Sequence, residues 1–104
     1  SIKSRFGWDI RRITRMIFVT LVRFKVKPTK ETIAENLRLT ENEVREGIKD
    51  LAVYWTLGTY DAVVTIEAPD EKTLMRTLLR RAGWMSTETL VAVPAEEARK
   101  LVEA

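Results

Sequence analysis

A chain of 104 residues has room for one domain with a single modest core. With 45% hydrophobic and 32% charged residues its composition is that of a folded globular protein, and no apolar run approaches the roughly 20 residues of a membrane-spanning helix. The absence of Cys and His excludes disulfides, thiolate nucleophiles, imidazole bases and the metal sites built on these ligands.

The positive charge lies at the start of the chain. Residues 1–15 hold five basic side chains and one acidic one, a net charge of +4, whereas residues 16–104 hold 13 basic and 14 acidic side chains, a net charge of −1. The overall charge of +3 and the pI near 9.4 therefore describe a basic N-terminal arm, and residues 16–104 form the single domain. Either the arm is native, or Met16 is the natural start and the arm is an added segment or an extended reading frame.

A native arm would be amphipathic, because its apolar residues recur at helical spacing: Ile2, Phe6, Ile10 and Ile13. We expect such an arm to dock on its own body or on a neighbouring subunit. Contact with a membrane surface or with nucleic acid is the alternative, since five cations attract anionic surfaces.

The first predicted element of the domain is a strand over residues 16–26, which are apolar and β-branched until Lys27 and Pro28 stop it. Residues 29–51 then follow a helical period with Thr29 as the N-cap. The change of period from two to 3.6 marks the passage from strand to helix.

A second start signal lies inside this helical segment. Thr40 and Glu43 have the spacing of a capping box, in which the Thr hydroxyl accepts a hydrogen bond from the amide three residues on. We therefore expect the first helix to break near Leu39.

The middle of the chain predicts a hairpin followed by a helix. Residues 52–57 and 60–67 are β-rich runs joined by a turn at Gly58. Asp70 then caps a second helix, which ends before Gly83.

The last part of the chain predicts a strand over residues 87–93 and a short helix that Pro94 opens. The resulting order of elements predicts an α+β, ferredoxin-like βαββαβ fold, with a four-stranded antiparallel sheet and both long helices on one face. Several strands are apolar on both sides, so the sheet face without helices is expected to be buried in an interface. A second copy of the chain, related by a two-fold axis, is the simplest partner for it. We therefore predict a homodimer or a higher homo-oligomer.

The hairpin carries a family resemblance. Residues 54–61 (Tyr-Trp-Thr-Leu-Gly-Thr-Tyr-Asp) resemble the Gly-x-Tyr-Asp signature of the GYD domain family, and the resemblance continues through residues 67–70 and 86–90. That family belongs to the dimeric α/β-barrel group of ferredoxin-like folds, and its members are largely uncharacterised. The resemblance therefore implies a fold and a dimer more than a reaction.

The same hairpin is similar to the effector-binding domain of Lrp/AsnC regulators, which binds small amino acids between subunits. Residues 32–51 also resemble a helix-turn-helix. Its candidate recognition helix is acidic and would be repelled by phosphates, and Arg38 stands where the tight turn requires Gly. We therefore do not expect this segment to read DNA.

Seven side chains are candidate ligand-binding residues: Tyr54, Trp55, Tyr60, Asp61, Glu67, Trp84 and Glu88. The two Trp and Tyr54 either wall a pocket for a planar or apolar ligand or pack in the core and at a dimer interface. Tyr60 and Asp61 either line a pocket or serve the hairpin turn. Glu67 and Glu88 either face inward, where burial would raise the pKa of a carboxyl and allow base chemistry, or lie at solvated strand ends.

A weaker candidate is a basic stripe on the second helix: Lys72, Arg76, Arg80 and Arg81. It either tracks phosphates or is the solvated face of an amphipathic helix. The favoured function is binding of a small molecule near the sheet or the dimer interface, with a cofactor-independent oxygenase or isomerase as the alternative and nucleic-acid binding as a second one. We expect no metal, no cofactor and a cytoplasmic location.

Overall fold

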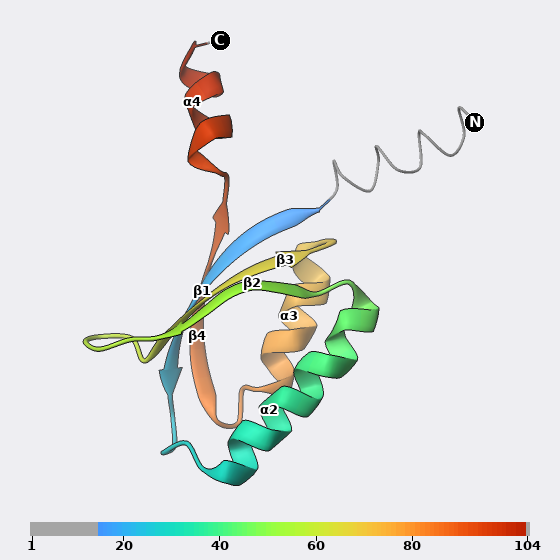
Figure 1. Cartoon of the computed structure of the whole chain (residues 1–104), viewed down its shortest axis with the longest axis vertical. Coiled ribbons are helices and arrows are strands. Elements are labelled where there is room, and N and C mark those ends of the chain that lie inside the picture. Colours follow the sequence, from blue (N-terminus) through green and yellow to red (C-terminus); the bar gives the residue numbers. More distant parts are fainter. Residues whose placement is uncertain (1–14, 104) are drawn as a thin grey trace.

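The computed structural model describes residues 15–103, so the N-terminal arm expected at residues 1–15 lies outside the described residues except for Arg15. One antiparallel four-stranded sheet carries two helices on one of its faces, and a further helix extends away at the C-terminal end (Figure 1). The chain is thus a two-layer α+β structure with one open sheet face.

The elements follow the predicted order. Strand β1 spans Met16–Phe24, α2 Lys30–Glu43, the 3₁₀ turn η1 Val44–Glu46, β2 Lys49–Trp55, β3 Ala62–Ala68, α3 Glu71–Arg80, β4 Met85–Ala92 and α4 Ala95–Glu103. The order across the sheet is β2-β3-β1-β4, and every neighbouring pair is antiparallel. The ferredoxin-like fold and the short C-terminal helix predicted from the sequence are therefore confirmed.

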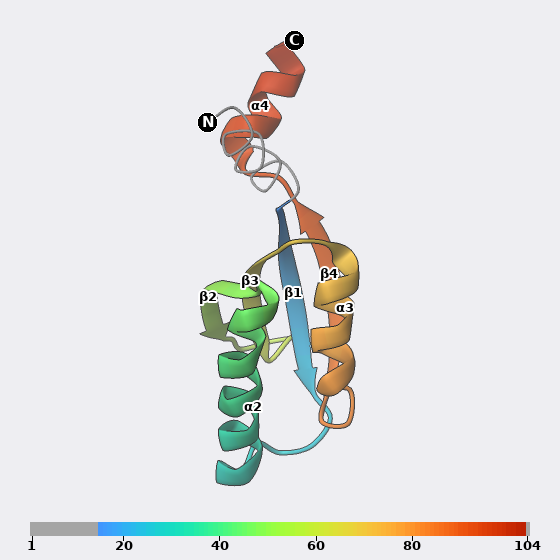
Figure 2. The same cartoon turned by 90° about the vertical axis from the view of Figure 1, so that its right-hand side faces the viewer.

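The central strand β1 carries apolar side chains on both faces of the sheet. Phe18, Thr20 and Val22 are buried beneath the helices, whereas Val19 and Leu21 point to the open face and are half-buried. The core beneath the helices gathers apolar side chains from the sheet, from the residues before β2 and from α3: Phe18, Ile48, Ile66, Ala68 and Leu74. Figure 2 shows α2 and α3 on this same side of the sheet.

The predicted break near Leu39 is wrong, because α2 continues to Glu43. The Thr40 hydroxyl does not cap; it donates to the carbonyl of Asn36 at 2.8 Å, within the helix. The carboxylate of Glu43 turns toward α3 and binds two arginines there, so it does not complete the capping box. The box forms instead at the true helix start, where Thr29 caps Thr32.

Gly47 ends the helical segment and turns the chain into β2. Its φ of 92° is left-handed, and a Cβ there would lie 2.8 Å from Cγ of Pro69, so only glycine fits. The chain is already extended at Lys49, three residues before the predicted strand start. The resemblance of residues 32–51 to a helix-turn-helix therefore does not correspond to the structure, which forms one helix and a strand there.

Helix α4 stands apart from the two layers (Figures 1 and 2). Its apolar residues Leu101 and Val102 are 73% and 87% exposed. Within residues 15–103, no helix combines the length and the hydropathy that a membrane crossing requires.

Candidate functional site

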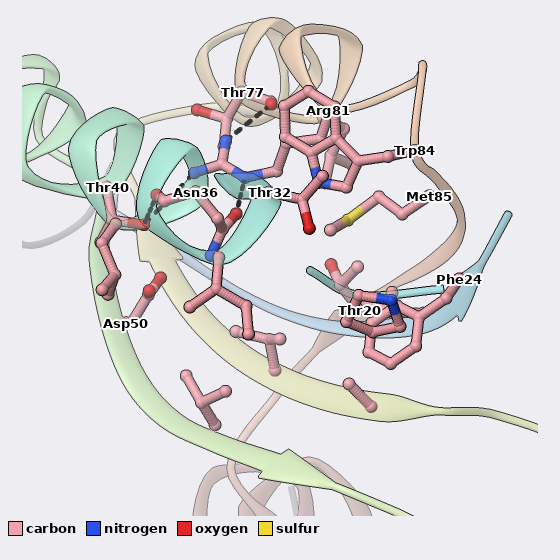
Figure 3. A pocket seen from close by; sticks show the side chains of 18 of the residues that line it. Thr20, Phe24, Thr32, Asn36, Thr40, Asp50, Thr77, Arg81, Trp84 and Met85 are labelled. Carbon is pink, nitrogen blue, oxygen red and sulfur yellow. Dashed lines mark hydrogen bonds between the residues drawn. The ribbon is translucent and has the colours of Figure 1, made fainter. Parts of the chain in front are cut away.

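A cavity of about 380 Å³ lies between the sheet and the two helices α2 and α3. We call it the interlayer cavity. Its walls are mainly apolar side chains of β1, β2 and β3 on one side and of α2 and α3 on the other, and it is open to solvent, since Leu37 and Trp55 of its lining are 58% and 63% exposed. Polar side chains gather toward one side, at Asn36, Thr40 and Asp50, and large apolar ones toward the other, at Phe24, Trp84 and Met85 (Figure 3).

The aromatic side of the cavity is built from three separate elements. Phe24 ends β1 and meets Trp55 of β2 edge to face, with ring centroids 5.1 Å apart and planes at 62°. Trp84 follows α3, and its carbonyl accepts a hydrogen bond from Lys25 N at 3.0 Å. Two of the three aromatic side chains predicted to wall a pocket, Trp55 and Trp84, thus line the cavity, whereas Tyr54, next to Trp55 in β2, faces the other side of the sheet.

A buried ion pair joins the two helices at the wall of the cavity. Glu43 is 1% exposed and receives Arg81 in a bidentate pair, with both N···O distances at 2.8 Å. Arg81 Nε donates to Asn36 Oδ1 at 2.6 Å, and the remaining donors reach the carbonyl of Thr77 and the hydroxyl of Thr40. All five N–H groups of this guanidinium therefore have acceptors, which satisfies a buried charge fully.

The basic stripe predicted on α3 is largely occupied by carboxylates. Arg80 donates to Glu43 at 3.1 Å and to Glu46 at 2.8 Å, and Arg76 lies 3.9 Å from Glu46. Glu43 and Glu46 thus offset two of the four positive charges of the stripe, Arg81 is buried, and Arg76 and Lys72 remain exposed. The pairing with Glu43 and Glu46 weakens the attraction of this stripe for phosphates.

The open face of the sheet holds a second polar cluster. The hydroxyl of Tyr60 donates to Glu88 Oε2 at 2.5 Å, and the guanidinium of Arg23 lies 5.1 Å from the centroid of the Tyr60 ring. Tyr60 and Glu88, both sequence candidates, are thus brought together across β1, and Arg23 is a third member that the sequence did not single out. They lie on the face opposite the interlayer cavity, where Glu88 is paired with Leu21 in the sheet.

The hydrogen bond from Tyr60 to Glu88 raises the pKa of Tyr60, with burial and the charge of Glu88 adding to the effect and Arg23 opposing it. In a Tyr54→Phe background, where Tyr60 is the one remaining tyrosine, we expect Glu88→Gln to lower the midpoint of phenol ionisation toward its ordinary value. Absorbance near the phenolate band follows this titration. Glu67→Gln is the matched control and should leave the midpoint unchanged; equal shifts in both variants would contradict the assignment.

Asp61 serves the hairpin rather than a pocket. Its carboxylate accepts from the amide of Phe24, its own amide donates to the carbonyl of Val22, and its carbonyl accepts from Thr56 N, all at 2.8 Å. Gly58 takes a φ of 102° at the tip of the hairpin loop. The Gly-x-Tyr-Asp segment thus ties the loop to the end of β1 and carries the ring of Tyr60 over the sheet.

Glu67 lies at the opposite end of the sheet and pairs with Arg15. Both line a second cavity of about 480 Å³ between the sheet end and α4, together with Val93, Pro94 and Glu97. Glu67 is therefore far along the sheet from the hairpin candidates, and the structure does not bring it together with them.

The element order, the sheet order and the tied hairpin define an α+β domain of the ferredoxin-like class. A family model for the GYD domain matches residues 18–102 of this chain. The chain therefore belongs to the GYD domain family, and the resemblance stated from residues 54–61 is confirmed. A search of curated proteins found no match for it.

Proposed function

We propose that this GYD domain binds a small, mainly apolar molecule in the interlayer cavity. The cavity itself carries the proposal, because about 380 Å³ lies within the range of roughly 300–1,000 Å³ that is usual for small-molecule sites. Its walls combine apolar and aromatic side chains with a few polar groups on one side, as such sites do (Figure 3).

Binding is favoured over catalysis by where the acid–base candidates lie. Tyr60 and Glu88 are on the opposite face of the sheet, Asp61 is held by backbone groups, and Glu67 is at the far end of the sheet with Arg15. None of the four lines the interlayer cavity. An enzyme of the oxygenase or isomerase type that used the interlayer cavity would therefore need acid–base groups other than these four.

We further propose that the protein acts as a homodimer through its open sheet face. Apolar side chains of all four strands lie on this face: Val19, Leu21, Tyr54, Val63 and Leu90. Tyr54 is 65% exposed and Leu90 49% exposed in the single chain. Such a contiguous apolar surface is typical of an interface, and a two-fold axis would cover it with its own copy. The cytoplasmic location stays a prediction.

Filling the interlayer cavity should weaken binding. Val64 lines the cavity, and its neighbour Val63 points to the open face. We expect Val64→Phe to raise the dissociation constant of the probe 2-(1-naphthyl)ethanol at least about tenfold, since a ring in the cavity displaces the ligand's apolar body and a lost contact of about 1.4 kcal/mol corresponds to a factor of ten. Isothermal titration calorimetry measures the constant.

Val63→Phe is the matched control, because it adds the same ring on the other face of the same strand. Its affinity for the probe should equal that of the unmodified chain. If neither the unmodified chain nor Val63→Phe binds the naphthyl probe, or if Val64→Phe and Val63→Phe bind it with equal affinity, the proposal that the cavity is the binding site is contradicted. Native mass spectrometry of protein purified from its host reports the subunit number and any retained ligand in one measurement.

A further inference from the structure

We propose that the ligand of the interlayer cavity is an amine: an apolar or aromatic body bearing one ammonium group, which sits against the carboxylate of Asp50. This inference rests on the proposed binding function and names the chemical class of its ligand. It depends on three features of the cavity: an unengaged carboxylate, a guanidinium with no donor to spare, and an aromatic wall at the other side.

Asp50 lies on the helix-covered side of β2. In the pairing with β3 it is opposite Ile66, a core residue that is 5% exposed. A β-bulge between Asp50 and Ala52 interrupts the alternation of side chains between the two faces of the sheet. Its side chain lines the cavity, and no hydrogen bond reaches its carboxylate from any residue of the range 15–103. Burial raises the pKa of Asp50, with Glu43 adding to the shift and the nearby charge of Arg81 opposing it. Asp50 is itself an exposed residue, so its unpartnered carboxylate at the cavity wall is accessible to a cationic group, with which it can form a charge-assisted hydrogen bond.

An acidic ligand is disfavoured by the same geometry. Among residues 15–103, Arg81 is the one basic side chain that lines the cavity, and its five N–H groups already donate to Glu43, Asn36, Thr77 and Thr40. A ligand carboxylate would meet Asp50 and Glu43 without a free guanidinium donor. In the described part of the chain the lining carries two carboxylates, Glu43 and Asp50, against the guanidinium of Arg81, so its net charge favours a cation.

Two further polar side chains and an aromatic wall complete the lining of the cavity. The hydroxyl of Thr77 is buried, lines the cavity and has no partner in the described part of the chain. Asn36 is fixed by the bond that its Oδ1 accepts from Arg81, which leaves its Nδ2 as a donor for an oxygen atom of the ligand's body and not for the ammonium group. On the other side, Phe24, Trp55 and Trp84 offer flat apolar surface for the body of the ligand.

The test compares three probes that share one aromatic body: 2-(1-naphthyl)ethylamine, 2-(1-naphthyl)ethanol and 1-naphthylacetate. At pH 7, calorimetry on the unmodified chain should show the amine binding about tenfold or more tightly than the alcohol, as expected for a charge-assisted hydrogen bond, and the acid binding most weakly. Asp50→Asn should bring the amine to the affinity of the alcohol. Glu88→Gln, which removes a carboxylate from the opposite face, should leave the preference intact.

The outcomes separate this inference from the proposed function. If the amine and the alcohol bind the unmodified chain equally and Val64→Phe still blocks both, the amine assignment is overturned and the cavity remains a binding site. If the acid binds best, the assignment is likewise overturned. If no naphthyl probe binds, the proposed function fails and the inference fails with it. The comparison on the unmodified chain needs no variant, so it decides the matter even if Asp50→Asn does not fold.

Discussion

Arg81→Met is expected to lower the free energy of unfolding by about 3 kcal/mol, because it leaves the carboxylate of Glu43 buried without its main partner. Glu43 is 1% exposed and accepts both of its 2.8 Å hydrogen bonds from Arg81. Removing one partner of a buried pair typically costs roughly 3–5 kcal/mol. We take the lower end of this range, since Arg80 still reaches Glu43 at 3.1 Å.

Urea unfolding followed by tryptophan fluorescence measures this loss, with Arg38→Met as the matched control. Arg38 pairs with Glu35 one turn away on α2, and its side chain is 58% exposed, so the control should change the unfolding midpoint little. The double variant Glu43→Leu, Arg81→Met should be more stable than Arg81→Met alone, because no uncompensated charge is left in the interior. A stability of Arg81→Met within experimental error of the unmodified chain would show that the pair is not buried as described.

The fold was predictable where local pattern and tertiary structure agree. Residues 16–24 alternate between two apolar faces, and the Gly58 turn with Asp61 identifies the hairpin, so the sheet and its open face followed from the sequence. The unbroken course of α2 through Leu39 was not predictable from the local sequence. Glu43 is taken by Arg81, a partner 38 residues later, and this contact removes it from the capping box that its spacing to Thr40 suggests.

The candidate site was predictable only in its aromatic part. Trp55 and Trp84 line the cavity, but Tyr54 does not, since adjacent residues of one strand point to opposite faces. Asp50 was missed because the helical period was extended over residues 29–51, which placed this carboxylate on a helix. Arg81 was assigned to a basic stripe, because helical spacing shows which residues share a face but not which carboxylates lie against it.

The second large effect is expected at the open face of the sheet. Leu21→Lys should convert the proposed homodimer into monomers, raising its dissociation constant about a hundredfold or more. Leu21 lies in the central strand and points away from the helices, between Val63 and Glu88 of the neighbouring strands. A two-fold interface over this face would bury two added ammonium groups, and desolvating each costs several kcal/mol, which the neighbouring Glu88 carboxylate, already bound by Tyr60, offsets only in part.

Sedimentation velocity over a range of concentrations measures the dissociation, and circular dichroism confirms that the sheet persists. Leu79→Lys is the matched control, because this leucine lies on α3, away from the open face, and is 67% exposed. A monomeric unmodified chain at micromolar concentration, or a Leu21→Lys variant that stays dimeric, would contradict the interface. Because Leu21 faces away from the interlayer cavity, monomeric Leu21→Lys should still bind 2-(1-naphthyl)ethylamine, and this result would show that one subunit holds the complete binding site.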